Sequence, residues 1–370
     1  MPLFSLFTAT QATINPVQTE RLIIDPANLD TPAAHQAIAR AASILRAGGL
    51  VALPTETVYG LGANALDPTA VARIFEAKQR PSWDPIIVHI AGPVADNPML
   101  AALVTDIPEA ARKLMSAFWP GPLTLLMPRS IAVPDNVTAG RPLVGVRMPA
   151  HPVAYRVILE AGVPIAAPSA NLFSHTSPTT AQHVLDDLDG RIDAILDAGP
   201  TLHGVESTVL DPTRSPMLIY RPGAITADQI LAVAASVELF QPPAVKQNES
   251  PVSGLPSPGV GIRHYAPRAR LILVQGPAAD LPRVLEGAAQ AHAGKRIGVM
   301  LPAQMRFEIP ANAVLFDWGR WDAPEELAAR LYAGLRALDA AGCEVIVCPM
   351  PAPEGIGTAV CDRLRKAAQN

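Results

Sequence analysis

Residues 52–62 read ALPTETVYGLG and combine the features of a buried strand with those of a binding loop. The apolar stretch 50–53 predicts a buried strand, and the glycines at 60 and 62 predict a turn. Open sheets collect their ligands at the ends of strands. We therefore examine this stretch first, because it places four hydrogen-bonding side chains at such an end: Thr55, Glu56, Thr57 and Tyr59.

The composition is that of a folded protein larger than one ordinary domain. The chain has 370 residues, 49% hydrophobic and 17% charged, which predicts well-formed cores and two or three domains. A formal net charge of −4 gives no overall basic surface, so any contact with phosphate or RNA must be local. No apolar run approaches the roughly 20 residues of a membrane span, and the first residues lack the features of a signal peptide. The three cysteines, all near the C-terminus, have neither zinc-binding spacing nor an even number. We expect a soluble, cytoplasmic protein.

Helices and strands are interspersed in the first 235 residues. A capping residue followed by proline predicts helices beginning at Thr31-Pro32, Asp67-Pro68 and Ser177-Pro178. Several strands follow one another without an intervening helix, which favours a mixed α/β (α+β) fold over a regular doubly wound sheet. The predicted strands are residues 49–53, 85–90, 122–127, 143–148, 164–167, 193–197, 207–211 and 217–221.

A change of composition divides the chain. Residues 239–268 contain six prolines and little periodicity, which is typical of a semi-extended linker. Beyond it, strands and helices alternate and predict a small parallel-sheet domain. Its strands are expected at 271–276, 296–301 and 344–350, and its helices near 280–292, 323–341 and 356–369. The predicted parts are an N-terminal extension (1–31), a first domain (32–238), the linker (239–268) and a second domain (269–370).

Gly60, Gly62 and Ala65 match the dinucleotide-binding pattern G-x-G-x-x-A, but their context does not fit. That pattern requires the glycines to lie directly between a strand and a helix. Here the predicted strand ends near Leu53 and the next helix begins only after Asp67. We therefore do not predict a dinucleotide site, and the scattered histidines predict no metal site built from protein ligands.

Polar clusters follow several of the predicted strands. Each alone is more often a helix cap or a solvated surface than a binding site. Together they combine arginine forks, a lysine and short hydrogen-bond donors, which suit phosphate and carboxylate groups. We interpret them as a pocket for an anionic small molecule, a nucleotide or a phosphorylated metabolite. The side chains are Lys78, Arg80, Arg147 and Arg221, with Ser169, Asn171, Ser177 and Ser207.

Nine motifs lie along the first domain: PTETVYGLG (54–62), KQRP (78–81), PIIVHI (85–90), FWPGPLTLLM (118–127), GVRMPAHP (145–152), APSAN (167–171), SPTT (177–180), GVESTVLD (204–211) and YRPGAI (220–225). In this order they resemble the YrdC-like domain of threonylcarbamoyl-AMP synthases. Residues 257–271 and the ending GIGTAVCDRLRKAA (355–368) are similar to the two-domain form of that family. The resemblance implies a twisted α/β catalytic domain over 32–238 and a smaller Rossmann-like domain over 269–370.

The resemblance implies an enzyme that converts L-threonine, bicarbonate and ATP to threonylcarbamoyl-AMP and pyrophosphate. The product supplies the threonylcarbamoyl group for an adenosine beside the anticodon of tRNA. Implied partners are the three substrates, with tRNA or the downstream transfer proteins as further candidates and no membrane. Magnesium is expected to be held mainly through the ATP phosphates and water, since no pair of carboxylates is evident.

The resemblance also assigns roles to residues. For L-threonine it implies Thr57, His89, Arg147 and Ser207, with the backbone at Ala167. For ATP it implies Lys78 and Arg80, which also neutralise the departing pyrophosphate, then Ser169, Asn171, Ser177, Arg221, the backbone of Leu143, and Tyr265 with its neighbours Arg263 and His264.

Two departures from the family pattern and two alternatives remain at this point. Asp84, within the nucleotide site, stands where the family often has asparagine, so its charge should repel ATP unless Arg80 or magnesium offsets it. Val260 and Gly261 are smaller than the family's residues.

One alternative is a carbamoyl-adenylate-forming carbamoyltransferase, although its zinc-finger segment is not evident here. The other is an RNA-binding YrdC-like protein.

Overall fold

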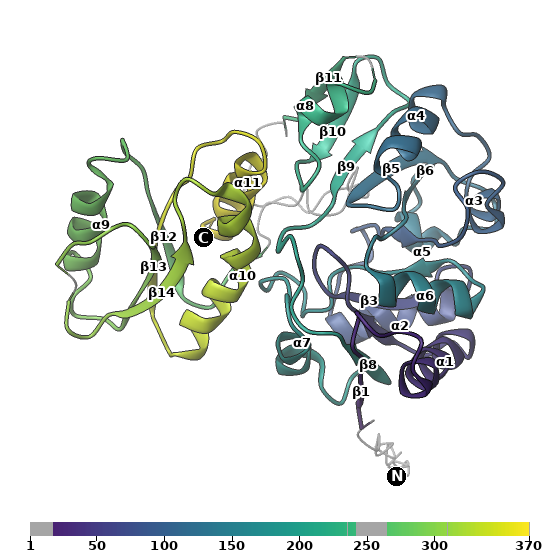
Figure 1. The fold of residues 1–370 in the computed structure, drawn as a ribbon, viewed down its shortest axis with the longest axis horizontal. Helices are drawn as coiled ribbons and strands as arrows, with labels where there is room; N and C mark the ends of the chain where they lie inside the picture. Colours follow the sequence, from purple (N-terminus) through teal and green to yellow (C-terminus); the bar gives the residue numbers. More distant parts are fainter. Residues whose placement is uncertain (1–17, 235, 242–264, 309, 370) are drawn as a thin grey trace, which may run out of the picture.

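Two separate sheets organise the chain in the computed structural model, which describes residues 18–234, 236–241, 265–308 and 310–369. An eleven-stranded mixed sheet belongs to the larger body in Figure 1, and a four-stranded parallel sheet belongs to the smaller one. The predicted fold class, a twisted mixed α/β domain followed by a smaller parallel-sheet domain, is confirmed. The predicted linker lies mostly outside the described residues, and Arg263, His264, Val260 and Gly261 lie there too.

The large sheet mixes parallel and antiparallel neighbours. Strands β4 and β6 are parallel, for example, whereas β2 and β3 are antiparallel. This mixture follows from consecutive strands that lack a crossover helix. In spatial order the strands are β1 (Glu20–Ile23), β8 (Ala194–Asp197), β2 (Val51–Leu53), β3 (Gly60–Asn64), β7 (Ile165–Ala166), β4 (Val88–His89), β6 (Leu143–Arg147), β5 (Leu123–Pro128), β9 (Thr208–Asp211), β10 (Met217–Arg221) and β11 (Val237–Leu239).

Capping explains where the helices of this domain begin. The Thr31 side chain accepts a hydrogen bond from Ala34 N, and that of Asp67 accepts from Thr69 N and Ala70 N. Both predicted starts are confirmed. The helices are α1 (Pro32–Arg46), α2 (Pro68–Lys78), α3 (Pro98–Leu103), α4 (Glu109–Phe118), α5 (Asp135–Thr138), α6 (Pro152–Ala161), α7 (Ala181–Leu188) and α8 (Ala227–Leu231).

Two local predictions are wrong. The glycines predicted to form a turn lie in strand β3, and the helix predicted to begin at Ser177 begins later, because Thr180 is the N-cap of α7. Gly62 is needed for close packing rather than for a turn. A Cβ there would lie 2.9 Å from Ile165 Cγ2 and 3.1 Å from Val51 O. The same strand rules out a dinucleotide loop at this position.

The second domain has the alternating pattern that its sequence predicts. Its strands lie in the order β12 (Arg270–Val274), β15 (Val345–Pro349), β13 (Ile297–Pro302) and β14 (Val314–Gly319), all parallel. Strand β14 was not predicted from the sequence. The helices are α9 (Leu281–Gln290), α10 (Pro324–Ala340) and α11 (Gly357–Ala367).

Helices α10 and α11 lie on the side of the second domain that faces the first (Figure 1). One hydrophobic cluster joins both domains, since it contains Val58 and Val205 together with Leu327 and Leu331 of α10. Gly204 permits this approach: a Cβ there would lie 2.5 Å from Ala328 O, and its φ is +67°. The docking surface of the second domain therefore lies directly against the segment that precedes β9.

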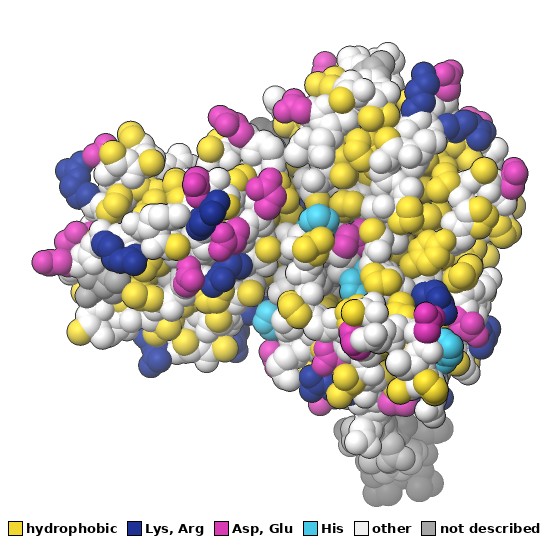
Figure 2. Space-filling model, in the orientation of Figure 1, with side chains coloured by type: hydrophobic (Ala, Val, Ile, Leu, Met, Phe, Trp, Pro, Cys, Tyr) yellow, Lys and Arg dark blue, Asp and Glu magenta, His cyan; other side chains and the backbone are white. Residues whose placement is uncertain are grey.

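Strand β1 lies within the range predicted as an extension and pairs with β8 at the edge of the large sheet. Across the described parts of the chain, no helix combines the length and apolar character needed to span a membrane. On the face shown in Figure 2, lysine and arginine side chains lie scattered among acidic ones, in keeping with the expectation that any phosphate contact is local.

Candidate functional site

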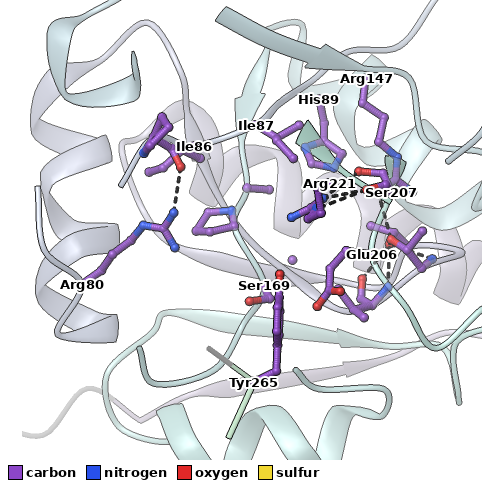
Figure 3. Close-up of a pocket in the computed structure, with 17 residues that line it drawn as sticks. Arg80, Ile86, Ile87, His89, Arg147, Ser169, Glu206, Ser207, Arg221 and Tyr265 are labelled. Carbon is purple, nitrogen blue, oxygen red and sulfur yellow. Dashed lines mark hydrogen bonds between the residues drawn. The ribbon is translucent and has the colours of Figure 1, made fainter. Parts of the chain in front are cut away.

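A pocket lies where strands β4 and β6 end, at His89 and Arg147, and where strands β3 and β9 begin (Figure 3). Eight of its side chains are polar residues predicted from the sequence for threonine or ATP, and they come from segments far apart in the chain. The lining residues are Thr55, Thr57, Val58, Gly60, Arg80, Pro85, Ile86, Ile87, His89, Arg147, Ala167, Pro168, Ser169, Glu206, Ser207, Arg221 and Tyr265.

At one end of the pocket, Arg147 is held in a fixed orientation. It lies beside His89 because the two are register partners on the parallel strands β6 and β4. Its Nη1 donates to Thr57 Oγ1 at 3.0 Å, and its Nη2 lies 2.6 Å from Glu56 Oε1. Burial would raise the pKa of Glu56, but the charge of Arg147 and hydrogen bonds to the carboxylate together outweigh it, so the pKa lies below its usual value.

His89 is neutral in this environment. Burial, aided by the charge of Arg147, lowers its pKa to about 3. Its Nδ1 is buried and has no hydrogen-bond partner among the described residues. A buried polar atom of this kind is costly unless a ligand or water satisfies it. His89 therefore offers a ligand an uncharged imidazole beside a fixed guanidinium.

The TETVY loop (55–59) is rigid because its side chains bond to its own backbone. Thr55 Oγ1 donates to Val58 O at 2.6 Å and accepts from the backbone N–H groups of Thr57 and Val58. Tyr59 OH donates to Gly199 O at 2.7 Å, so this ring is a packed anchor. The polar residues at the strand end thus hold the loop in shape and leave Thr57 at the pocket wall.

At the other end, Arg80 is tied to its own segment. Its Nη2 lies 2.9 Å from Asp84 Oδ2 and donates to Pro85 O at 2.7 Å. Figure 3 shows Arg80 at the left of the pocket. Burial raises the pKa of Asp84, although the charges of Arg80 and Lys78 oppose this. The extra negative charge noted in the sequence is therefore paired with Arg80, as that analysis required for ATP to bind.

Lys78 does not line the pocket. It is fully buried, and its Nζ donates to the carbonyl oxygens of Ser169 at 2.6 Å and Asn171 at 2.5 Å. Burial and the charge of Arg80 lower its pKa well below the usual value. In this conformation Lys78 supports the Ser169–Asn171 loop from behind. The role predicted for it at the phosphates stays a prediction.

Four other predicted residues are not among the lining residues: Asp84, Leu143, Asn171 and Ser177. Asn171 donates through Nδ2 to the carbonyls of Leu172 and His175, which closes the same loop. Ser177 donates to Glu206 Oε1 at 2.5 Å. Ser177 is not a helix N-cap, because α7 is capped by Thr180.

Arg221 and Ser207 form one unit in the middle of the pocket. Arg221 donates through Nε and Nη2 to Ser207 O, at 3.1 and 3.0 Å, and through Nη2 to Ser207 Oγ at 3.1 Å. Ser207 Oγ also lies 2.8 Å from Thr124 Oγ1. The arginine on β10 therefore fixes the start of β9, and both side chains face the cavity (Figure 3).

Glu206 was not assigned a role from the sequence, and neither were the apolar lining residues other than Ala167. Glu206 accepts hydrogen bonds from Arg363 Nε at 2.7 Å and from Tyr332 OH at 3.0 Å, and both partners belong to the second domain. Tyr265, just beyond the undescribed segment, points into the same space (Figure 3). The signal for Glu206 in the sequence was its place in GVESTVLD, beside the predicted Ser207.

Three acidic residues in or beside the pocket each form an ion pair with an arginine. Glu56, Asp84 and Glu206 lie 2.6, 2.9 and 2.7 Å from Arg147, Arg80 and Arg363. The described part of the chain holds no group of three or more His, Cys, Asp or Glu residues placed to bind a metal. A metal at this pocket would consequently need its ligands from the substrate and water.

Comparison with known proteins agrees with the geometry. A family model described as "Telomere recombination" matches residues 43–223, and another, "Threonylcarbamoyl-AMP synthase, C-terminal domain", matches 225–369. The threonylcarbamoyl-AMP synthase of Pyrococcus abyssi is 44% identical over 330 residues, 89% of this chain and 93% of that protein. That of Bacillus subtilis is 45% identical over 332 residues, 90% and 92%. The solved structure of P. abyssi Sua5 complexed with L-threonine gives a TM-score of 0.82 at 42% identity, over 95% of this chain and 97% of that one.

Proposed function

The chain belongs to the threonylcarbamoyl-AMP synthase family, and we propose that it joins L-threonine, bicarbonate and ATP into threonylcarbamoyl-AMP with release of pyrophosphate. It is then an enzyme of the nucleotidyltransferase type. The observation that carries this proposal is the fixed Arg147 beside neutral His89, in the same pocket as Arg80 and Arg221. Arg147 and His89 suit an amino acid, and Arg80 and Arg221 suit a polyphosphate, so one pocket can hold both substrates.

At the amino-acid end, the planar guanidinium of Arg147 pairs with the carboxylate of threonine. Its hydrogen bond to Thr57 and its ion pair with Glu56 fix its direction before the substrate arrives. The unpartnered Nδ1 of His89 and the hydroxyls of Thr57 and Ser207 are within the same wall and meet the polar groups of the substrate. The apolar Ile87 and Ala167 remain for its methyl group.

The chemistry needs positioning more than a nucleophile from the protein. The deprotonated amine of threonine attacks the carbon of bicarbonate, and water leaves, which gives an N-carboxy anion. An oxygen of that anion attacks the α-phosphorus of ATP, and the bond to the bridging oxygen of pyrophosphate breaks. Arg80 and Arg221 face the phosphates and stabilise the charge that develops on the leaving group. Lys78 acts behind them by shaping the Ser169–Asn171 loop.

We further propose that Mg²⁺ enters with ATP and supplies additional neutralisation of the phosphate charge. The residues fit this mode better than a site built from protein ligands, because Glu56, Asp84 and Glu206 are each ion-paired with an arginine. The product is proposed to serve threonylcarbamoylation of tRNA in the cytoplasm, through downstream transfer proteins. The family membership supports this part of the proposal.

The test is a mass-spectrometric assay with ATP, L-threonine, ¹³C-bicarbonate and Mg²⁺. We expect threonylcarbamoyl-AMP that carries the label, together with pyrophosphate, and loss of both when threonine is omitted. Pyrophosphate formed without threonine would contradict the proposal and indicate a different adenylate-forming reaction. No product from protein that still binds ATP would also contradict it.

A further inference from the structure

Glu206 is a buried carboxylate in the wall of a pocket built for anionic substrates. Its Oε1 accepts from Ser177 Oγ at 2.5 Å and from Tyr332 OH at 3.1 Å. Its Oε2 accepts from Tyr332 OH at 3.0 Å and from Arg363 Nε at 2.7 Å. Of these groups, only Ser177 belongs to the first domain. The charge of Arg221 in the first domain also acts on Glu206, but its direct ion-pair partner, Arg363, comes from the second domain.

Arg363 is placed for this task by helix α11. Its side chain is 1% exposed, and its Nη1 also bonds Asp362, which Lys366 contacts in turn. The guanidinium lies 5.0 Å from the centre of the Tyr265 ring, and that ring stacks on Tyr332 at 5.8 Å. The same cation therefore contacts Glu206 and the aromatic ring that closes one side of the pocket.

Burial would raise the pKa of Glu206, but the charges of Arg363 and Arg221 and the bond from Ser177 lower it to about 2. Glu206 is therefore fully ionised while the second domain is docked. Without Arg363, a buried and unpaired carboxylate would remain at the wall that also carries Arg221 and Ser207. Such a charge is costly in itself and repels a bound triphosphate.

We propose that Arg363 is a positioning residue supplied by the second domain, which neutralises Glu206 and thereby makes the pocket competent to bind the nucleotide. Docking of the second domain and binding of ATP are then coupled. The coupling is reciprocal: ATP stabilises the docked arrangement as much as docking favours ATP. This inference rests on the proposed function in that its ligand is ATP, and it gives the second domain a defined part in the same site.

The test measures binding of Mg²⁺–ATP and of L-threonine, each alone, by calorimetry on the full chain. We expect Arg363→Gln to raise the Kd for ATP about tenfold or more and to change the Kd for threonine less than about threefold. The double variant Glu206→Gln/Arg363→Gln, which removes the unpaired charge, should return the Kd for ATP to within about threefold of the unmodified protein.

Arg336→Gln is the matched control. Arg336 also joins the two domains, through Asp187 at 2.7 Å and Thr176 O at 2.6 Å, but none of these groups lines the pocket. Its loss weakens the docking surface without leaving a charge in the pocket, so the Kd for ATP should rise by less than about threefold.

Equal impairment of ATP binding in Arg363→Gln and in the double variant would overturn the proposal. It would show that ATP binding is weakened by lost packing and not by the unpaired charge of Glu206. Unchanged ATP binding in Arg363→Gln would overturn it as well. If Arg363→Gln does not fold, the double variant decides alone: a Kd for ATP raised tenfold refutes the inference. Because binding is measured without turnover, absence of threonylcarbamoyl-AMP from the unmodified protein would refute the proposed function and leave this comparison intact.

Discussion

The two ends of the pocket satisfy their buried charges in different ways. At the threonine end, Arg147 on β6 contacts Glu56 and Thr57, which lie in the loop between β2 and β3 of the same domain. At the nucleotide end, Glu206 finds Arg363 and Tyr332 across the boundary between the domains. Under the proposed assignment, the amino-acid site is complete within one domain, whereas the nucleotide site is complete only when both domains are docked.

This difference indicates what each domain contributes to the reaction. The long sheet fixes the relative positions of β4, β6 and β9, and through them the groups that meet threonine. The second domain contributes charge and aromatic surface rather than a substrate site of its own, within the residues described. Changes at the first end should therefore alter threonine binding alone, and changes at the second should alter nucleotide binding and domain docking together.

The largest loss of activity is expected from a substitution at the threonine end of the pocket. Arg147→Ala removes the partner of the substrate carboxylate and leaves Glu56 buried without its cation, so kcat/KM for threonine should fall about 10³-fold. Steady-state kinetics with each substrate varied would measure this. Thermal unfolding of the same variant, compared with Glu56→Gln/Arg147→Gln, separates loss of binding from loss of stability. An unchanged KM for threonine would remove Arg147 from the site.

The next largest effect is expected from a substitution at Lys78, which supports the Ser169–Asn171 loop. Lys78→Met keeps an unbranched side chain one atom shorter than lysine but removes both hydrogen bonds to the Ser169 and Asn171 carbonyls. Leaving these acceptors unpaired should cost about 2–3 kcal/mol of unfolding free energy and lower kcat/KM for ATP at least about tenfold. Chemical denaturation measures the first, and Lys113→Met, at a largely exposed lysine, is the control. Full stability in Lys78→Met would contradict this role.

Acid stability should report on the interdomain charge. The pKa of Glu206 in the folded protein, about 2, lies below its usual value of 4.5, so its stabilising effect is complete above pH 4.5 and is lost as pH falls toward 2. Between pH 7 and pH 4 the unmodified protein should lose about 1 kcal/mol more unfolding free energy than Glu206→Gln. Denaturant titrations at the two pH values measure the difference, and parallel losses would contradict the assignment.

The smallest expected effect is at Asp84. Replacing it with asparagine releases Arg80 from a buried ion pair and removes a negative charge from the nucleotide end. The Kd for ATP should fall about threefold, while the unfolding free energy of the unliganded protein falls because Arg80 loses its partner. Calorimetry and denaturation on the same preparation would show both. Weaker ATP binding would mean that Asp84 assists the nucleotide rather than restraining Arg80.

Much of this arrangement is readable from the sequence where local chemistry decides the structure. Thr31 and Asp67 predict helix starts correctly because their side chains cap the adjacent backbone. Thr57, His89 and Arg147 meet in the pocket as the family motifs imply. The sequence could not show Glu206 and Arg363 as a pair, because 157 residues separate them and only domain docking brings them together. The turn predicted at Gly60 and Gly62 was wrong for a related reason. These glycines are required by close packing between neighbouring strands, which forms only in the folded sheet.

The most direct test of the division between the two ends is hydrogen exchange of the unmodified chain with Mg²⁺–ATP alone and with L-threonine alone. ATP should slow exchange in helix α11 and in residues 204–207, since binding favours the docked second domain. Threonine should slow exchange in residues 55–59 and strands β4 and β6 and leave α11 unchanged. Protection of α11 by threonine alone, or no protection of α11 by ATP, would contradict the account.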